Sequence, residues 1–335
     1  MNDRSRLKAL MAPYFHALYE GQQAVAAEQL SQLCASDAVF HLSHPFGSVA
    51  GAAAWNHGPV QQLFHAFADV ERRDFILIAG RTEAGDHWVG TAGYYLGTFS
   101  QPLLGIPPTG RITGFRYHEF YRFDGDAMVE FQGIWDLAEL MQNAKVWPMG
   151  PSLGVPGMTP GPATQDGRVV SSDSDELTRA STHVVTEMLV HMGKHPQQPV
   201  EAMKLDTFWH PHFNWYGPGG IGAMRGVAGF RHDHQIPFLN AMPDRRGGYD
   251  NETYFWGDEN YVGVTAWPGM RMTLTGDGWL GMAPTNQPIT MRSLDFWRVE
   301  NGKIRENWVL VDLLDVWHQL EVDVLARMRQ LVSHP

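Results

Sequence analysis

The sequence predicts an α+β fold that occurs twice in one chain, with a curved antiparallel sheet packed on helices in each half. Three observations lead to it: the length, an internal repeat and the order of the predicted elements. The chain has 335 residues, which is long for one ordinary domain and favours two. In each half the predicted helices come first and a run of strands follows. We expect a first domain over residues 1–145, a connector over 146–176 and a second domain over 177–335.

The internal repeat relates the two halves position by position. Residues 104–137 align without a gap with residues 280–313 at an offset of 176, and ten of the 34 positions are identical. A second block, residues 51–69, aligns with residues 226–244 at an offset of 175. Self-similarity at a fixed offset indicates a duplicated structural unit. Equivalent positions of the two halves can therefore be compared directly.

Each half is expected to begin with an amphipathic helix. Apolar residues recur at helical spacing over residues 5–20 and 177–192. Shorter helices are expected near residues 24–34 and 199–207. A further helix should end near Asp69 in the first half and at the equivalent Asp244 in the second.

The rest of each half is expected to form strands. These segments are rich in aromatic and β-branched side chains and are bounded by turn residues. The predicted strands are 39–42, 75–81, 87–99, 112–123 and 127–135 in the first half, and 213–216, 252–257, 260–267, 289–299 and 303–311 in the second. The sequences FDGD and ENGK predict hairpin turns before the last strands, because Gly and Asn tolerate positive φ.

Residues 146–176 are dense in Pro, Gly and Ser, which predicts an irregular surface segment.

The composition argues against several classes of protein. The net charge of −11 and the absence of a basic stripe argue against nucleic-acid binding. The single Cys34 excludes an internal disulfide framework. No run of 18 apolar residues and no signal-peptide core occurs, so we expect a cytoplasmic protein without a membrane partner.

The order of elements resembles the NTF2-like fold, in which the curved sheet forms a cone. More narrowly, FWRVENGKIRENWVLVD (296–312) resembles the last strand pair of SnoaL-like polyketide cyclases, and the first half keeps PPTGR (107–111). The resemblance covers both halves. It implies two tandem NTF2-like domains, which pair as an intramolecular pseudo-dimer because family members commonly pair through the outer sheet. It does not fix the reaction, since the fold carries cyclases, isomerases, dehydratases, hydrolases and binding proteins.

Each half ends its last strand with an aspartate, Asp136 or Asp312, at one repeat position. By strand alternation Trp308, Leu310 and Asp312 share a face, which we expect to line the cone. Apolar surroundings raise the pKa of an aspartate and suit it to acid/base chemistry. The resemblance implies an acid/base role in aldol ring closure, for Asp312 first and Asp136 second. The alternative is that each aspartate N-caps the helix after it.

Two arginines occupy one repeat position on the preceding strand, Arg116 and Arg292. An inward arginine there would hold a substrate carboxylate or enolate, or pair with the neighbouring aspartate. The alternative is an outward side chain with a solvated head. His118 shares the face of Arg116, has no counterpart in the second half, and is a candidate proton shuttle in the first.

The repeat also pairs His57 with His232 on the helix expected to line each pocket. A histidine at a pocket mouth is a plausible acid/base partner for an aspartate. The alternative is a structural histidine on an apolar helix face. We therefore include both among the candidate catalytic residues.

Aromatic residues on the first strand of each half are expected to line the pockets. These candidates are His41, Trp215 and Tyr216, together with Trp308 on the last strand. The pairs His210/His212 and His232/His234 lack the usual spacing of zinc ligands, so we expect no metal.

The sequence favours a cofactor-independent enzyme. It contains no strand-linked G-x-G-x-x-G, no P-loop and no G-x-S-x-G elbow. We expect acid/base chemistry of the SnoaL-like class, aldol or isomerase type, on a small hydrophobic carbonyl compound, better preserved in the second half. A non-catalytic hydrophobic-ligand-binding protein and a dehydratase or hydrolase on the same fold stay open as alternatives, as does a homo-oligomer of the two-domain chain.

Overall fold

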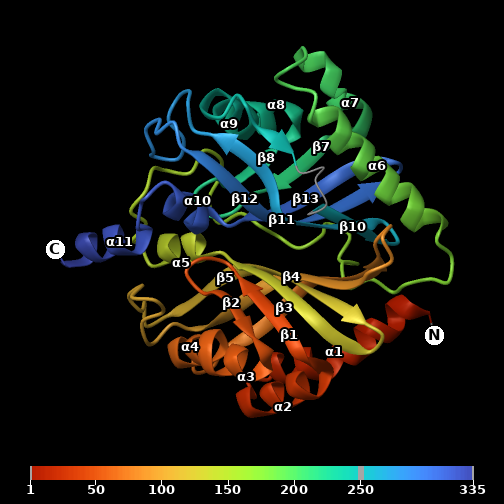
Figure 1. The fold of residues 1–335 in the computed structure, drawn as a ribbon, viewed down its shortest axis with the longest axis vertical. Helices are drawn as coiled ribbons and strands as arrows, with labels where there is room; N and C mark the ends of the chain where they lie inside the picture. The colour runs from red at the N-terminus through yellow and green to blue at the C-terminus, as the bar shows by residue number, and fades with distance from the viewer. Residues whose placement is uncertain (1, 248–252, 334–335) are drawn as a thin grey trace.

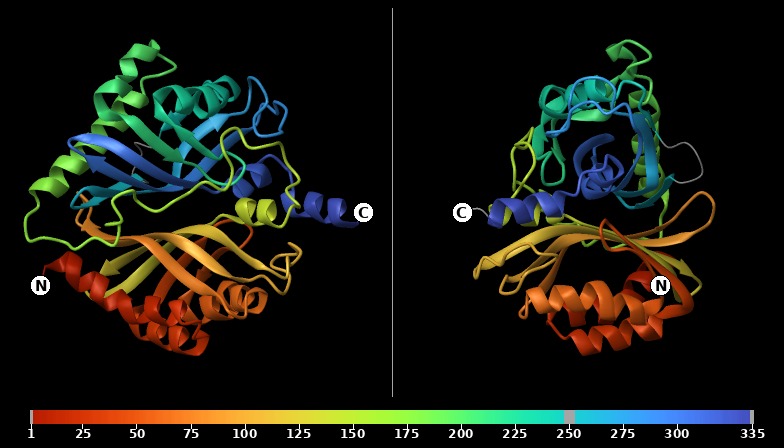
Figure 2. Two further views of the ribbon diagram at one scale, coloured as in Figure 1. Left: turned by 180° about the vertical axis from the view of Figure 1, so that it is seen from behind. Right: turned by 60° about the vertical axis from the view of Figure 1, so that its left-hand side comes forward.

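The computed structural model describes residues 2–247 and 253–333. Within them two curved sheets face each other, and most helices cover the outer sides of the sheets (Figures 1 and 2). The predicted α+β class is therefore confirmed. The boundaries at residues 145 and 177 stay a prediction. Below, residues 3–143 are called the first half and residues 176–333 the second half.

The first half places helices before and between its first strands. Its elements are α1 (Asp3–Tyr19), α2 (Gln23–Leu33), β1 (Cys34–Leu42), β2 (Gly47–Ala50), α3 (Gly51–Trp55), the π-helical turn η1 (Asn56–Val60), α4 (Gln61–Ala66), β3 (Glu71–Arg81), β4 (His87–Thr98), β5 (Ile112–Asp124), β6 (Ala127–Trp135) and α5 (Leu137–Asn143). The strands form one sheet in the order β2-β1-β6-β5-β4-β3.

The second half repeats this plan. Its elements are α6 (Glu176–Met192), the 3-10 turn η2 (Val200–Met203), α7 (Leu205–Phe208), β7 (Trp209–Tyr216), β8 (Ala223–Arg225), α8 (Gly226–Phe230), the π-helical turn η3 (Arg231–Gln235), α9 (Ile236–Ala241), β9 (Arg246–Gly247), β10 (Thr253–Asp258), β11 (Tyr261–Thr273), β12 (Pro288–Glu300), β13 (Lys303–Val311), α10 (Leu313–Gln319) and α11 (Val324–Ser333). The sheet order is β10-β11-β12-β13-β7-β8, and β9 pairs with β11.

One strand pair in each sheet corrects the sequence prediction. The sheets were expected to be wholly antiparallel, but β1 pairs with β6 in parallel, and β7 pairs with β13 in parallel. The reason is that a long connection separates the members of each pair, with β2 to β5 and three helical segments between β1 and β6, and β8 to β12 and three helical segments between β7 and β13, so the chain returns in the same direction. The other main pairings are antiparallel as predicted.

Most predicted elements are present within a few residues of their expected bounds. The helix expected near 199–207 is split into η2 and α7, and Cys34, which the sequence placed in a helix, begins β1. The strands β2, β8 and β9 were not predicted, because two to four residues are too few to show alternation. Residue 252, at the start of one predicted strand, lies outside the described residues.

The two sheets pack against each other through an apolar layer. Repeat-equivalent Phe120 and Phe296 meet edge to face with ring centroids 5.1 Å apart, and Trp88 stacks on Trp256 at 5.5 Å. At Gly80 on β3 a Cβ atom would lie 2.5 Å from the carbonyl oxygen of Gly257 on β10, so only glycine allows this approach. Buried side chains of this layer from both halves are Ile76, Ile78, Trp88, Ala92, Phe120, Ile134, Tyr216, Ala223, Trp256, Tyr261, Leu294, Phe296, Trp308 and Leu310. The correspondence of this packing to the dimers of single-domain proteins stays a prediction.

The segment between the halves is irregular, as predicted, but it is tied to both sheets. It bridges the edge of β3 at Leu77 and Arg168, and the edge of β8 at Ala223 and Val155. The Pro160 carbonyl oxygen accepts a hydrogen bond from the Trp308 indole at 2.9 Å. The segment therefore covers sheet edges that would otherwise be open.

No helix among the described residues has both the length and the apolar character that a membrane crossing requires.

Candidate active site

A cavity of about 230 Å³ lies inside the cone of the second half. It is enclosed between the concave face of the sheet and the helices α6, α8 and α9. The aromatic side chains in its wall are Trp209, Trp215, Phe230, Phe238, Phe255, Trp279 and Trp297. An aromatic wall with few polar groups is typical of a site for a small hydrophobic molecule.

Asp295 on β12 is the acidic group of this wall. Alternation along β12 turns Ser293, Asp295 and Trp297 to the cavity, while Leu294 and Phe296 face the other sheet. Burial in apolar surroundings raises the pKa of Asp295 to about 8, and a hydrogen bond with Ser293 opposes the shift. Its Oδ1 has no hydrogen-bond partner among the described residues. Asp295 is therefore mostly a neutral acid near pH 7.

The further polar side chains of the wall include His234 and Asn307, together with Thr186, Gln235, Arg245, Thr253 and Ser293. The His234 ring stacks on Trp215 with centroids 4.5 Å apart. Burial, and then the charge of Arg245, lower the pKa of His234 to about 3, so the imidazole is neutral. The His234 Nδ1 and the Asn307 Oδ1 have no hydrogen-bond partner in the part of the chain that the structure describes. A ligand with polar groups could satisfy such atoms.

The same place in the first half is filled. Glu119 is the repeat equivalent of Asp295, but its carboxylate is bound by the guanidinium of Arg72. It also accepts hydrogen bonds from Tyr95 at 2.9 Å, Tyr121 at 2.7 Å and Trp135 at 3.0 Å. These large side chains occupy the interior of the first cone. At this repeat position Glu119 is therefore paired with Arg72, whereas Asp295 faces a cavity.

A model of the SnoaL-like polyketide cyclase family matches residues 14–144 and residues 198–320, which together are more than half of the chain. The chain belongs to the SnoaL-like polyketide cyclase family. The two matched segments fall on the two halves.

Several solved structures are similar to part of this chain. A proposed polyketide cyclase from Xanthomonas campestris pv. campestris is 17% identical, covers 43% of this chain and 99% of its own, with a TM-score of 0.36. IdmH, a proposed polyketide cyclase from Streptomyces antibioticus, is 23% identical, covers 42% and 99%, with a TM-score of 0.35. AclR, a proposed hydroxylase from Streptomyces galilaeus, is 17% identical, covers 42% and 96%, with a TM-score of 0.34. Comparison with curated proteins gives no match.

In this SnoaL-like chain the face of β13 that lines the cone is the opposite of the predicted one. Asn307, Val309 and Val311 line the cavity, whereas Trp308 and Leu310 lie in the layer between the sheets. The expectation that Trp308, Leu310 and Asp312 face the cone interior is therefore wrong. Alternation separated the two faces correctly, but both faces are apolar because the other half covers the outer one.

Asp312 and Asp136 cap helices at the junction between the halves. Asp312 Oδ1 accepts a hydrogen bond from the Asp315 N–H at 3.2 Å, and Asp136 Oδ1 accepts one from the Glu139 N–H at 2.9 Å. Burial first, and then Asp315, raise the pKa of Asp312 to about 7, and burial raises the pKa of Asp136. The gap beside them is about 10 Å³, which holds no substrate. The alternative raised by the sequence, a helix cap, is the observed geometry.

The repeat-equivalent His57 and His232 do not reach the cavity. Both are exposed, and the His232 Nδ1 lies 2.6 Å from the carboxylate of its neighbour Asp233. The π-helical turns η1 and η3 change the helix phase, so that His234 and not His232 faces the cavity. Asp312, His232 and Arg292 therefore do not lie together on one cavity.

The two arginines differ in their surroundings. Arg116 is 1% exposed and lies between the halves, where it contacts backbone carbonyl groups. Arg292 is half-buried; it lies 3.5 Å from Asp312 and over the Trp267 ring at 5.2 Å. Neither lines the cavity. His118 is buried between the sheets with its Nδ1 2.6 Å from the Leu294 carbonyl oxygen, and burial lowers its pKa.

Of the remaining candidates, Trp215 alone lines the cavity. Tyr216 stacks on Trp308 in the layer between the sheets, at 5.6 Å. His41 lies 2.7 Å from Ser48 Oγ. Strand alternation separates Trp215 from its neighbour Tyr216, so the two cannot share one pocket wall.

No group of three His, Cys, Asp or Glu side chains within residues 2–247 and 253–333 is placed to hold a metal ion. His210 Nδ1 lies 2.9 Å from the Arg305 guanidinium, and His212 Nδ1 lies 3.2 Å from that of Arg225. These histidines act as acceptors for arginines on the surface.

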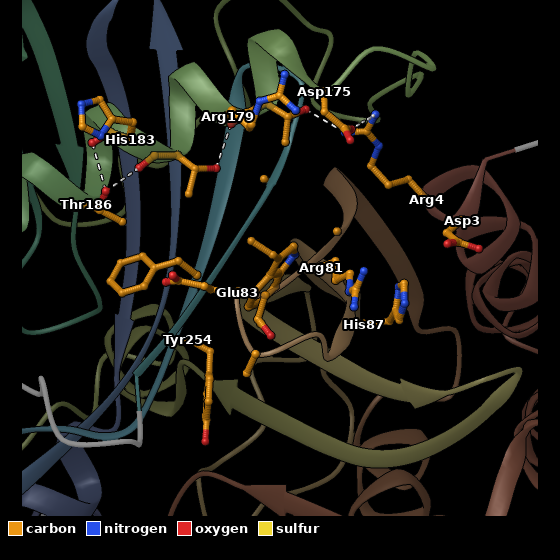
Figure 3. A pocket seen from close by; sticks show the side chains of 18 of the residues that line it. Asp3, Arg4, Arg81, Glu83, His87, Asp175, Arg179, His183, Thr186 and Tyr254 are labelled. Carbon is orange, nitrogen blue, oxygen red and sulfur yellow. Dashed lines mark hydrogen bonds and ion pairs between the residues drawn. The ribbon is translucent and has the colours of Figure 1, made fainter.

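A larger groove of about 1180 Å³ lies between the halves, bordered by α1, the β3–β4 turn and α6 (Figure 3). Charged side chains of both signs face it, among them Arg81, Glu83 and Arg179. At one end Arg4 pairs with Asp175 at 3.1 Å. Arg81, Glu83 and Arg179 are exposed, so they lack the desolvation that tunes acids and bases, and the cone cavity is the better candidate.

Asp295 is absent from the candidates predicted from the sequence, because its repeat equivalent is a glutamate and the position is not an identical one. The signal was present in another form. Glu119 and Asp295 place an acid at one repeat position in the middle of a strand, directly before the repeat-identical Phe120 and Phe296. Such an acid has no cap or turn to explain it.

Proposed function

We propose that the protein is a cofactor-independent acid/base enzyme that acts on a small hydrophobic carbonyl compound in the cavity of the second half. The observation that carries this proposal is Asp295, a carboxyl group with a pKa raised to about 8 in an aromatic-walled cavity. Membership of the SnoaL-like family supports a reaction of the aldol or isomerase type. The proposed acid/base residue is Asp295, in place of Asp312.

The neutral carboxyl group suits the first step of such a reaction. It can donate a hydrogen bond to a substrate carbonyl oxygen and stabilise the negative charge that develops there when an α-proton leaves. The His234 imidazole lines the same cavity and can accept that proton in a concerted step, because transfer of the Asp295 proton to the carbonyl oxygen leaves a carboxylate in the cavity that stabilises the imidazolium. Return of the proton to another carbon gives an isomer, and attack of the enol carbon on a second carbonyl gives a ring.

The volume of the cavity limits the substrate. About 230 Å³ lies below the roughly 300–1,000 Å³ usual for pockets that take drug-sized ligands. The cavity therefore fits a compact molecule. 2-Tetralone, a neutral bicyclic ketone with acidic α-protons, is a suitable probe.

The test is α-proton exchange of 2-tetralone and related ketones in D₂O, followed by NMR. Wild-type protein should accelerate exchange, and Asp295→Asn should lower the enzymatic rate by about 10²–10⁴-fold, the usual contribution of general acid/base catalysis. Asp312→Asn is the matched control, because it changes the same residue type outside the cavity. Equal loss in both variants would count against Asp295.

A ligand-binding protein without catalysis is the second candidate. The aromatic wall and the unpaired polar atoms of Asp295, His234 and Asn307 would serve a tight hydrophobic receptacle equally well. If no ketone exchanges faster with wild-type protein and yet 2-tetralone binds, this candidate is favoured. A dehydratase or hydrolase on the same fold would need an acid in the same cavity, so Asp295→Asn tests it with the corresponding substrates.

A further inference from the structure

The strands β7 and β13 separate at the wall of the cavity. Their last register pair is Tyr216 with Trp308, and beyond it β7 ends while β13 continues through Val309 to Val311. The carbonyl oxygen of Val309 therefore lies where residue 218, two residues beyond the end of β7, would donate a hydrogen bond if the pairing continued. A carbonyl group at such a buried place needs a donor.

The first half shows how that donor is normally supplied. Gly133 is the repeat equivalent of Val309, and its carbonyl oxygen accepts a hydrogen bond from the Ser43 N–H at 2.9 Å. The residue equivalent to Ser43 in the second half is Pro218, at the offset of 175 that also relates β1 to β7. Proline has no N–H group, so the second half cannot make this bond from its own backbone.

Arg116 of the first half supplies the missing donor. Its Nη2 donates to the Val309 carbonyl oxygen at 2.9 Å and to that of Gly217 at 2.7 Å. Its Nη1 donates to the Tyr216 carbonyl oxygen at 3.1 Å. One buried guanidinium thus joins the end of β7 to β13, and its planar fork suits several fixed carbonyl groups at once.

The equivalent arginine does not do this for the first half. Arg292 is half-buried, and its guanidinium lies beside Asp312 and Asp315. The first half already has the Ser43 donor and a cone filled by Arg72 and Glu119. The arginine of the first half therefore binds the cavity wall of the second half, whereas the arginine of the second half makes no equivalent contact with the first half.

The clamped backbone carries the candidate site. Val309 lines the cavity and is the register partner of Asp295 on β12, and Trp215 precedes Tyr216 on β7. We propose that Arg116 is a positioning residue of the first half that holds the β7–β13 wall, and with it Trp215 and Asp295, in the geometry that binds the ligand. The inference rests on the proposed function of that cavity. It also gives the first half a task other than a second active site.

Asp136 is a second side chain of the first half that binds backbone of the second half near the end of β7. Its Oδ2 accepts a hydrogen bond from the Gly219 N–H at 2.8 Å, directly after Pro218. The same loop contains Ile221, which lines the cavity. Two neighbouring side chains of the first half therefore fix the loop that follows β7.

The first experiment compares Arg116→Met with Arg292→Met, which changes the equivalent residue. Amide hydrogen exchange of the ligand-free protein should rise in segments 213–217 and 307–311 of Arg116→Met and stay near wild type in Arg292→Met. Affinity for 2-tetralone, measured by calorimetry, should fall about tenfold or more in Arg116→Met, as expected when buried carbonyl groups lose their donors. If Arg116→Met does not fold, Arg116→Lys takes its place, because it keeps the charge but loses the fork.

The second experiment restores the donor. Pro218→Ser gives the second half the N–H group that Ser43 supplies in the first. In the Arg116→Met background this change should recover most of the lost affinity and slow exchange in segment 307–311. A protein that is only destabilised would not be rescued by removal of a proline at that position.

The outcomes separate this inference from the proposed function. Unchanged exchange in Arg116→Met, or no rescue by Pro218→Ser, overturns the positioning role whatever the ligand does. If wild-type protein does not bind 2-tetralone and catalyses no exchange of ketone protons, the proposed function fails. The amide exchange data still decide whether Arg116 holds the β7–β13 wall.

Discussion

Asp312 accepts a hydrogen bond from the backbone N–H of His44 at 3.0 Å, across the junction between the halves. Its repeat equivalent Asp136 accepts one from Gly219, the repeat equivalent of His44, at 2.8 Å. The two aspartates thus make the same contact in opposite directions, while their other oxygens cap α10 and α5. Each aspartate therefore stands at the end of an apolar strand because its side chain there joins its own half to the backbone of the other half.

Asp312→Ala is expected to destabilise the protein and to spare chemistry in the cone cavity. The variant loses a helix cap and leaves the buried His44 N–H without an acceptor, and together these cost about 1–3 kcal/mol. The measurement is the midpoint of denaturant unfolding, combined with ketone exchange below that midpoint. Asp136→Ala should lose a similar amount of stability, because its contacts are equivalent, but it should also loosen the loop at Gly219 beside the cavity and weaken ligand binding. Loss of exchange in Asp312→Ala at unchanged stability would restore Asp312 as the acid/base residue.

Asp295→Asn is expected to do the opposite. The side chain keeps its shape, and the change removes a carboxyl group whose ionised form is disfavoured by burial. At pH 4 and below, where the carboxyl group holds its proton, stability should change by less than about 1 kcal/mol. Near pH 7 the variant should be at least as stable as wild type, because Asn does not carry the cost of protonating a buried acid, while ketone exchange falls steeply. Thermal unfolding and the exchange assay on the same preparation measure both. A large drop in unfolding temperature would show that Asp295 serves the fold.

Activity is expected to fall as the pH rises past about 8, because the proposed acid is Asp295 with its proton. The folded-state pKa of Asp295 lies above its ordinary value of 3.8, so the folded state holds the proton more tightly than the unfolded chain. The associated stability is present below pH 4 and is lost progressively up to about pH 8, at up to about 1.4 kcal/mol per pH unit. Unfolding curves from pH 5 to 9 should show this loss in wild type and a smaller one in Asp295→Asn. A flat activity profile to pH 9.5 would contradict the assignment.

The sequence was sufficient for the fold and for the repeat, because both depend on patterns that run along the chain. Helical spacing, strand alternation and the hairpin turns identified the main elements of each half, and the offset of 176 paired Arg116 with Arg292 and Asp136 with Asp312. The parallel pairing of β1 with β6 could not be read from the same patterns, because strand direction depends on how the chain crosses over.

The site was harder to predict because both faces of the sheet are buried. Trp308 and Val309 are neighbours on β13, one in the layer between the sheets and one at the cavity, and both are apolar. Alternation therefore defined two faces but not which of them lines the cone. Whether a cone contains a cavity depends on side chains from strands that are distant in the sequence, such as Arg72 beside Glu119. Only the fold brings these side chains together.

Arg72→Met is expected to destabilise the first half while leaving one ligand site per chain. The change leaves Glu119 and Asp74 buried without their cation, and breaking one side of such a pair costs about 3–5 kcal/mol. The double variant Arg72→Met with Glu119→Gln should recover part of this loss, since it removes an unpaired charge as well. Denaturant unfolding measures the stability, and calorimetry with 2-tetralone measures the stoichiometry. One equivalent per chain in wild type and in the double variant would agree with a filled first cone. Two equivalents in wild type would show that the first cone also opens to ligand.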